Sequence, residues 1–341
     1  MQQLFFLERG KVEWRDIESP EIVEPDDALV RPLAVATCDL DTGLLHSDVP
    51  FPGPFPLGHE GVGEVLEVGD EVTSVKAGDR VIIPFQISCG RCGRCARGLT
   101  ASCETVNPGA MYGLEPFGGP WGGFLTDAVR VPFADHMLVP LPDGLDPVAV
   151  ASLSDNVCDG WRTVAPFVGA PAEESVLVLG GNAPSIPFYS VAAAKALGVG
   201  TIDYLDFAGA SPDGSTKASR LGANVVDGAD ALKGQRYTIT VCSALEPDAM
   251  KAALKATEPD GTCVVNAIYF DDAMPLPMFS MYTRGVRLVT GRVNARAVIP
   301  EALASIVSGA LAPEGVTDQV VSWDECADAL VAEPHKFVIR R

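Results

Sequence analysis

The chain has 341 residues, and at roughly 100 to 200 residues per domain this length suggests two domains. Its residues are 47% hydrophobic and 21% charged, which are ordinary values for a folded protein and exclude wholesale disorder. The 45 acidic residues against 25 Lys and Arg give a formal net charge of −20, which argues against binding to nucleic acid or to a membrane surface. No apolar run reaches the roughly 18 residues of a membrane helix and no basic signal region begins the chain, so we expect a soluble, cytoplasmic protein.

The first part of the chain, to about residue 150, consists of short segments rich in Val and Ile between turns. Segments 28–35, 61–68 and 80–83 are bounded by stretches that contain Gly or Pro. This pattern predicts antiparallel strands of a sheet or barrel.

The second part alternates buried strands with helices. The pattern predicts strands at 175–179, 201–207, 224–226, 237–242 and 262–268, and helices at 185–197, 215–221 and 247–257. Such an alternation indicates an α/β unit with a parallel sheet and right-handed crossovers. After it we expect one more helix at 300–308 and a strand at 319–322.

Four of the nine cysteines lie close together in the first part. Cys89, Cys92, Cys95 and Cys103 have the spacing C-x2-C-x2-C-x7-C, and four thiolates at this spacing can surround a tetrahedral Zn²⁺. An iron–sulfur cluster and a set of free thiols are the alternatives. Because a closed site with four thiolates leaves no position for a substrate, a catalytic centre has to lie elsewhere.

A second group of metal-binding side chains precedes the cysteine cluster. Cys38 and Asp41 are followed about twenty residues later by His59 and Glu60. A thiolate and an imidazole with an open coordination position suit a catalytic zinc, although a single Cys is also a common core residue.

With these residues the sequence resembles the zinc-dependent medium-chain dehydrogenase/reductase family, which includes the zinc-containing alcohol dehydrogenases. The resemblance rests on residues 38–41, 58–65, 75–81 and 122–124 and on the four-cysteine lobe, and it covers essentially the whole chain. It implies an α/β fold with a GroES-like, β-rich catalytic domain at 1–157 that carries a structural zinc lobe at 89–103. It further implies a Rossmann NAD(P)-binding domain with a doubly wound parallel sheet at 158–290, and a return of the chain to the catalytic domain at 291–341.

The resemblance also implies roles at the catalytic zinc. Cys38 and His59 are its first two ligands, Asp41 accepts a hydrogen bond from the other ring nitrogen of His59, and Glu60 lies behind the metal. The residue two after the cysteine ligand is usually Ser or Thr, which starts the proton relay, whereas here it is Leu40. The route of the proton therefore stays open, with Thr42, His46 or a water as substitutes.

The third ligand is expected within residues 154–161. Asp155, Cys158 and Asp159 have suitable chemistry and would share one face of a helix. Gly160-Trp161 resembles the Gly-aromatic pair of the family, and counting back from this pair places Asp155 at the ligand position. Cys158 is the alternative because it is the softer donor.

The nucleotide site is expected at the glycine turn after segment 175–179, where a strand, a turn and a helix N-terminus present N–H groups to a pyrophosphate. No G-x-G-x-x-G is present, and Pro187 stands near the usual last glycine. Asp206 can bond both ribose hydroxyls and repels a 2′-phosphate, which favours NAD over NADP. The predicted cofactor-binding residues are Gly180, Gly181, Asn182, Ser185, Ile186, Asp206 and Ile268, and the resemblance adds Gly291 and Arg292 by their position in the family.

Together with its motifs, the resemblance implies an oxidoreductase, namely a zinc-dependent alcohol dehydrogenase or an aldehyde or ketone reductase that uses two Zn²⁺ per subunit and NAD. Same-fold alternatives are a dismutase or lyase with tightly bound NAD, and a degenerate nucleotide-binding protein without turnover. We expect a small alcohol or aldehyde as substrate and a homodimer or homotetramer as the assembly. An apolar or aromatic substrate is favoured by the loop residues Phe51, Phe55, Tyr112, Phe117 and Trp121.

Overall fold

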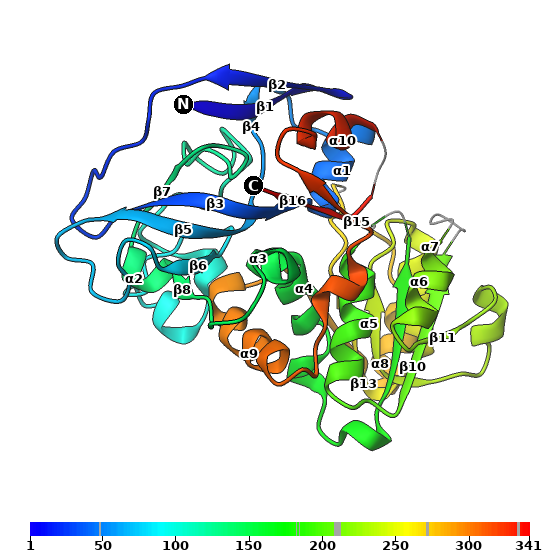
Figure 1. Ribbon diagram of the computed structural model, residues 1–341. Helices are drawn as coiled ribbons and strands as arrows, with labels where there is room; N and C mark the ends of the chain where they lie inside the picture. Colours follow the sequence, from blue (N-terminus) through cyan, green and yellow to red (C-terminus); the bar gives the residue numbers. More distant parts are fainter. Residues whose placement is uncertain (48, 182, 184, 208–212, 271–272, 333–334) are drawn as a thin grey trace. The chain divides into compact units, whose positions relative to one another are not determined.

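The computed structural model describes residues 1–341 apart from 48, 182, 184, 208–212, 271–272 and 333–334 (Figure 1). The chain divides into two compact units. The first comprises Met1–Cys158, Val293–Ala304 and Thr317–Arg341, and the second comprises Asp159–Arg292 and Ser305–Val316. The sequence predicted one return to the catalytic domain at residue 291, whereas Ser305–Val316 belong to the second unit.

The first unit is built mainly from antiparallel strands. They form a three-stranded sheet of order β2-β1-β4 and a seven-stranded sheet of order β15-β16-β3-β5-β6-β8, in which β7 pairs with β3. The strands are β1 (Gln2–Glu8), β2 (Lys11–Asp16), β3 (Ala28–Ala36), β4 (Phe55–Pro56), β5 (Glu60–Val68), β6 (Arg80–Ile83), β7 (Val129–Val131), β8 (Val139–Pro140), β15 (Gln319–Ser322) and β16 (Phe337–Arg340).

The second unit contains a parallel sheet of order β11-β10-β9-β12-β13-β14. Its strands are β9 (Ser175–Gly180), β10 (Thr201–Asp206), β11 (Asn224–Val225), β12 (Tyr237–Cys242), β13 (Thr257–Val265) and β14 (Arg287–Thr290). Successive strands of the chain are added outward from β9, first toward β11 and then toward β14, which makes the sheet doubly wound. The topological switch point therefore lies between β9 and β12.

The helices connect these strands and cover the sheets. They are α1 (Asp39–His46), α2 (Ala134–Met137), α3 (Pro147–Val150), α4 (Asn156–Arg162), α5 (Ile186–Ala196), α6 (Gly214–Arg220), α7 (Pro247–Ala256), α8 (Met278–Arg284), α9 (Ala295–Val307) and α10 (Cys326–Ala332). Right-handed crossovers put α5 and α6 on one face of the parallel sheet and α7 and α8 on the other (Figure 1). The expected GroES-like and Rossmann-type α/β fold is confirmed.

Two predicted elements differ at their ends. The strand predicted at 262–268 is β13, which ends at Val265, so Ile268 lies beyond the strand and is 56% exposed. The helix predicted at 300–308 is α9, which begins at Ala295 and keeps Pro300 in its interior. Asn294 starts this helix, since its carbonyl accepts the amides of Ala297 and Val298.

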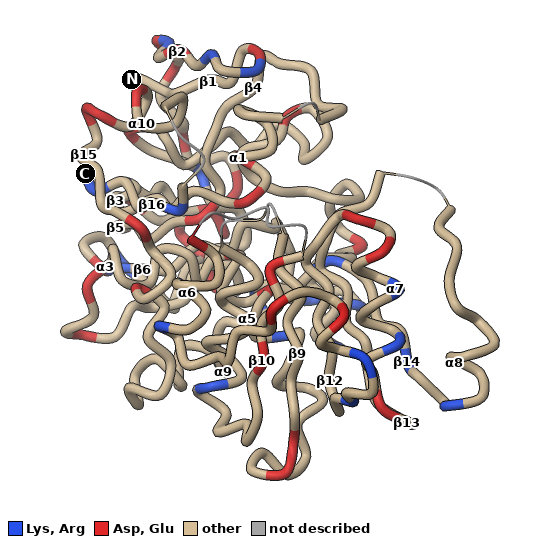
Figure 2. The backbone as a smooth tube through the Cα atoms, turned by 90° about the vertical axis from the view of Figure 1, so that its right-hand side faces the viewer, with Lys and Arg blue, Asp and Glu red and all other residues tan. Residues whose placement is uncertain are grey.

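In the backbone view of Figure 2 the Asp and Glu segments are spread over the chain, and several of the Lys and Arg segments lie near β12, β14 and α7. The spread of acidic segments agrees with the excess of 45 acidic over 25 basic residues. Among the described residues, the structure contains no helix with the length and apolarity needed to span a membrane.

Candidate metal centres and nucleotide site

The four-cysteine lobe brings all of its predicted ligands together. The sulfurs of Cys89, Cys92, Cys95 and Cys103 lie within 4.8 Å of one another. The sulfurs of Cys92 and Cys103 are 4.0 Å apart, close to the roughly 3.8 Å that separates two thiolates on a tetrahedral zinc. The geometry therefore fits a closed Zn²⁺ site.

Backbone N–H groups support these sulfurs. The amide of Cys92 points to Cys89 Sγ and that of Cys95 to Cys92 Sγ, each at 3.4 Å. The N–H groups of Glu104 and Cys95 lower the pKa of the Cys92 thiol to about 6. Donors of this kind stabilise the thiolate that a metal requires.

Cys95→Ser is expected to remove one Zn²⁺ per chain and to lower the free energy of unfolding by several kcal/mol, because a structural metal stabilises the lobe that it crosslinks. Metal analysis and denaturant unfolding measure both effects. Cys326→Ala is the matched control, since this buried thiol lies in α10 and outside the cluster. A Cys95→Ser protein with unchanged metal content would contradict the assignment.

The second metal-binding group begins at the first residue before α1. Cys38 is the N-cap of this helix, and its sulfur accepts the amide of Leu40 at 3.4 Å. Asp41 completes a capping box, because its Oδ2 accepts the Cys38 amide at 2.9 Å. The spacing Cys-x-x-Asp therefore fixes the helix start that carries the thiol.

Close backbone packing positions His59. Gly58 has φ +89°, a conformation that favours glycine, and its carbonyl accepts the amide of Phe124 at 2.7 Å. A Cβ on Gly123 would lie 2.2 Å from the carbonyl oxygen of Leu57. The glycines at 58 and 123 let two chain segments approach closely beside the imidazole.

Cys38, His59, Glu60 and Asp155 form a buried group whose candidate ligand atoms all lie within 4.8 Å of one another. Asp155 Oδ2 lies 3.3 Å from Cys38 Sγ and 3.6 Å from His59 Nε2. Ligand atoms on a tetrahedral zinc lie roughly 3.3 to 3.8 Å apart. These three side chains therefore have the separations of three ligands on one metal ion.

Glu60 is occupied by other partners. Its Oε2 lies 2.9 Å from the ammonium of Lys336, and its Oε1 accepts the amide of Asn156 at 3.3 Å. Lys336 is fully buried and also donates to the carbonyl of Thr37. These bonds engage both carboxylate oxygens of Glu60 and leave Cys38, His59 and Asp155 as the candidate ligands.

Sequence reasoning missed two residues beside this cluster. Lys336 lies 276 residues from Glu60 in the chain, and nothing in the local pattern signals its burial. Asn156 is fully buried with its side-chain oxygen 3.3 Å from Cys38 Sγ. Its position directly after the ligand candidate Asp155 was the available signal.

The electrostatics of the cluster favour a bound cation. Burial and then the Asp155 carboxylate raise the pKa of the Cys38 thiol well above its usual value. Burial disfavours the imidazolium of His59, but the carboxylates of Asp41 and Asp155 outweigh burial and raise its pKa to about 9. Burial raises the pKa of Glu60 to about 8 in spite of the Lys336 ammonium. A divalent cation would supply the positive charge that these groups otherwise take up as protons.

The predicted hydrogen bond between His59 and Asp41 is not formed. His59 Nδ1 and Asp41 Oδ1 are 3.8 Å apart, and neither atom has a hydrogen-bond partner among the described residues. Asp41 thus faces the imidazole nitrogen opposite the one that faces Asp155. A modest approach of the ring would complete the bond that fixes its tautomer.

The three candidates for the third ligand do not share a helix face. Asp155 precedes α4 with φ −148° and ψ −81°, which is not helical. Cys158 donates instead to the carbonyl of Leu153 at 3.0 Å, and Asp159 forms an ion pair with Arg162. Of the three, the structure brings only Asp155 to Cys38 and His59.

The proposed substitutes for the missing relay hydroxyl lie along α1. The ring of His46 contacts the carbonyl of Leu330 at 3.1 Å, and His46 ends the helix that Cys38 begins. The amide of Thr42 bonds to the carbonyl of Cys38 at 3.3 Å, which places Thr42 one turn after the thiol. Thr42 is therefore nearer to the cluster along α1 than His46.

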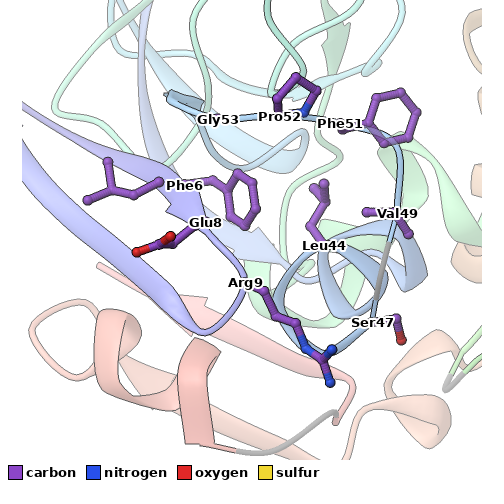
Figure 3. A pocket seen from close by; sticks show the side chains of 10 residues that line it. Phe6, Glu8, Arg9, Leu44, Ser47, Val49, Phe51, Pro52 and Gly53 are labelled. Atoms are coloured by element: carbon purple, nitrogen blue, oxygen red, sulfur yellow. The ribbon is translucent and has the colours of Figure 1, made fainter.

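The aromatic residues that the sequence suggested for substrate binding lie partly in the core and partly at the surface. Phe55 and Tyr112 are fully buried, so they pack the core. Phe51 and Phe117 make an edge-to-face contact at 5.1 Å, and Phe117 is 52% exposed. Phe51 also lines a surface hollow of about 350 Å³ between β1, α1 and the loop after α1. Figure 3 shows its side chain beside Val49 and Leu44; no residue of either metal cluster lines this hollow.

The glycine turn after β9 is closely packed. A Cβ on Gly180 would lie 2.1 Å from the hydroxyl of Tyr204, and one on Gly181 would lie 3.1 Å from Ala244. Packing thus requires a shift of Tyr204 for any side chain at 180, whereas a Cβ at 181 needs a shift of only a few tenths of an ångström. Asn182 lies outside the described residues.

The helix after this turn offers few N–H groups. Ser185 is buried and precedes Ile186, the first residue of α5, but Pro187 has no N–H. The amides of Phe188 and Tyr189 both bond to the carbonyl of Ser185 at 3.0 Å. The predicted pyrophosphate site therefore has fewer donors than a helix N-terminus without proline.

The other predicted cofactor residues lie at the carboxyl ends of the strands or beyond them. Asp206 ends β10, and Gly291 and Arg292 directly follow β14. The carbonyl of Gly291 accepts a hydrogen bond from Arg162 at 2.7 Å. Ligands of doubly wound sheets bind at this edge, so the positions fit a dinucleotide.

Comparisons with known proteins agree with this architecture. The model of the alcohol dehydrogenase GroES-like domain matches residues 24–143. An alcohol dehydrogenase of Geobacillus stearothermophilus is 31% identical over 318 residues, which cover 89% of this chain and 87% of the relative. A probable zinc-binding alcohol dehydrogenase of Mycobacterium tuberculosis is 28% identical over 93% of this chain and 81% of its own length. The alcohol dehydrogenase from Thermus sp. ATN1 superimposes with a TM-score of 0.90 at 26% identity over 100% of this chain and 99% of that one. The chain therefore belongs to the zinc-dependent medium-chain dehydrogenase/reductase family and is an oxidoreductase of the alcohol dehydrogenase type.

Proposed function

We propose that the protein transfers a hydride between an alcohol and a nicotinamide cofactor at a zinc ion held by Cys38, His59 and Asp155. The observation that carries the proposal is the buried cluster of these three side chains, with separations of 3.3 and 3.6 Å. When bound there, zinc supplies Lewis acidity that stabilises an alkoxide or polarises a carbonyl. Three protein ligands leave a fourth position for the substrate oxygen.

The surrounding side chains hold this arrangement. Asp41 fixes the start of α1 and thus the direction of the Cys38 thiolate. The Lys336 ammonium compensates the buried charge of Glu60, which lies behind the ligands. Asn156 can donate its side-chain N–H to the Cys38 thiolate when its amide is turned by 180°. We assign these residues to holding and orienting the ligands.

An activity assay tests the proposal. Zinc-replete protein is expected to change the absorbance of NADH or NADPH with members of a panel of alcohols, aldehydes and ketones. The panel should range from simple alcohols to formaldehyde and sugar alcohols, since relatives include a D-altritol 5-dehydrogenase and a glutathione-independent formaldehyde dehydrogenase. No turnover with any member, in protein shown to hold zinc, would contradict the function.

NAD is the cofactor that we propose, with NADP disfavoured, because Asp206 ends β10 with a carboxylate that would oppose a 2′-phosphate. Asp206→Ala is expected to improve the ratio of kcat/KM for NADP to that for NAD by about tenfold or more. This corresponds to roughly 1.4 kcal/mol of removed repulsion. Asp203→Ala on the same strand is the control and leaves the ratio unchanged. An unchanged ratio in Asp206→Ala would mean that the carboxylate does not face the ribose.

A homo-oligomer is also part of the proposal. Next to the edge strand β14, the helix α8 exposes Met278, Phe279 and Tyr282 at 63%, 82% and 85%. An open strand edge beside exposed apolar side chains suits pairing with a second copy of the chain. Phe279→Asp is expected to lower the mass that light scattering measures. We further propose a cytoplasmic location, which is supported by nine cysteines of which none forms a disulfide.

A further inference from the structure

A buried polar pair lies at the carboxyl ends of two neighbouring parallel strands in the second unit. Ser243 directly follows β12 and Asn266 directly follows β13, and the last residues of these strands, Cys242 and Val265, are register partners. Ser243 Oγ donates to Asn266 Oδ1 at 2.8 Å, and the two residues are 5% and 8% exposed. The pair is therefore fixed and almost completely withdrawn from solvent.

The amide of Asn266 is only half satisfied. Its Nδ2 is buried and has no hydrogen-bond partner among the described residues. Turning the amide by 180° would exchange its two ends and leave the oxygen without a partner instead. In either orientation one buried polar atom lacks a bond, which costs free energy unless a ligand supplies the missing partner.

The position of the pair points to the ligand. The amide of Ser243 bonds to the carbonyl of Leu179 in β9 at 2.9 Å, so the pair adjoins the switch point between β9 and β12. Leu245 and Ile268, two residues further along each segment, are 50% and 56% exposed, so the pair lies one layer below the open rim. Dinucleotides bind across such a switch point, with one mononucleotide on each half of the sheet.

The two halves of the parallel sheet carry different side chains at the carboxyl ends of their strands. The half that contains β10 ends in Asp206, whose carboxylate suits ribose hydroxyls. The half that contains β12 and β13 ends in Ser243 and Asn266. A carboxamide carries both a donor and an acceptor, so the nicotinamide carboxamide can pair with the amide of Asn266 in either of its orientations.

We propose that Asn266, oriented by Ser243, is a positioning residue that hydrogen-bonds the carboxamide of the nicotinamide ring. This inference rests on the proposed use of a nicotinamide cofactor. It assigns recognition of the reactive ring to a side chain of the second unit alone. Binding of the adenosine half of the cofactor does not depend on Asn266.

Titration calorimetry on the full zinc-loaded chain tests the proposal, with NADH and ADP-ribose as ligands. Asn266→Leu keeps the side-chain size but removes the amide. The variant is expected to bind NADH about tenfold more weakly, equivalent to roughly 1.4 kcal/mol, and ADP-ribose as tightly as the parent does. Its melting temperature without ligand should change little, because the substitution removes the buried Nδ2 that lacks a partner together with the acceptor of the Ser243 hydroxyl.

Thr240→Val is the matched control. Thr240 is buried in β12 and bonds to Thr257 at 2.9 Å within the sheet, so this variant should lose stability and keep both affinities. Equal losses for NADH and ADP-ribose in Asn266→Leu, or no loss of NADH binding, would overturn the inference alone. Failure of the parent protein to bind NADH would instead overturn the proposed function together with the inference.

Discussion

Asp155→Ala is expected to remove one of two zinc ions per chain and to lower turnover by at least about a thousandfold. Asp155 Oδ2 lies 3.3 Å from the Cys38 sulfur and 3.6 Å from His59 Nε2, so its loss opens one of three ligand positions. A thousandfold loss corresponds to about 4 kcal/mol, which is within the several kcal/mol that a metal contributes to stabilising charge in a transition state. Metal analysis and kcat/KM on the same preparation measure both effects.

Two variants sharpen this prediction. Cys158→Ala replaces the other candidate ligand, which donates to the carbonyl of Leu153, and should retain both zinc ions and most of the activity. Asp155→Cys supplies a softer donor at the same position and should retain the metal. Loss of zinc from Cys158→Ala combined with its retention in Asp155→Ala would reverse the assignment.

Lys336→Met is expected to lower the free energy of unfolding by about 3–5 kcal/mol near pH 9, where Glu60 is ionised. The substitution leaves Glu60 buried without the ammonium that lies 2.9 Å from its Oε2, and breaking one side of a buried ion pair has costs of this size. Chemical denaturation monitored by fluorescence measures the loss. Lys233→Met removes one side of an exposed pair with Asp230 and should change stability by less than about 0.5 kcal/mol.

The loss in Lys336→Met should depend on pH. In zinc-free protein, in which this test is made, the pKa of Glu60 rises from its usual 4.5 to about 8 on folding, and removal of Lys336 raises it further. A raised carboxyl pKa means that the folded state takes up a proton that the unfolded state lacks, so stability falls as pH rises above about 4.5. The difference between variant and parent should therefore be largest near pH 9 and shrink toward pH 5. A difference independent of pH would show that the cost is one of packing rather than of charge.

The sequence predicted most elements because their signals are local. The apolar runs of β9, β10 and β12 lie within one residue of the predicted segments, and the helices α5, α6 and α7 begin and end within one residue of theirs. Continuous apolar strands buried on both faces and amphipathic helices with clear ends give strong local patterns. The fold class therefore followed from pattern and family resemblance together.

The site was less predictable where it depends on distant segments or on backbone irregularity. Asp155 was chosen from its distance to Gly160-Trp161, but the helix assumed for it begins only at Asn156. Lys336 lies 276 residues from Glu60, so only the folded chain reveals their contact. The polar atom that Asn266 leaves without a partner depends on the pairing of β12 with β13, which no local sequence pattern specifies.

The most direct test of the account is the location of zinc in the folded chain. Anomalous diffraction at the zinc edge, together with metal analysis, is expected to give two ions per chain. One should lie among the sulfurs of Cys89, Cys92, Cys95 and Cys103, and the other within about 2.0–2.3 Å of Cys38 Sγ, His59 Nε2 and an Asp155 carboxylate oxygen. A single ion in the cysteine lobe, with Cys38, His59 and Asp155 holding none in zinc-replete protein, would contradict the account.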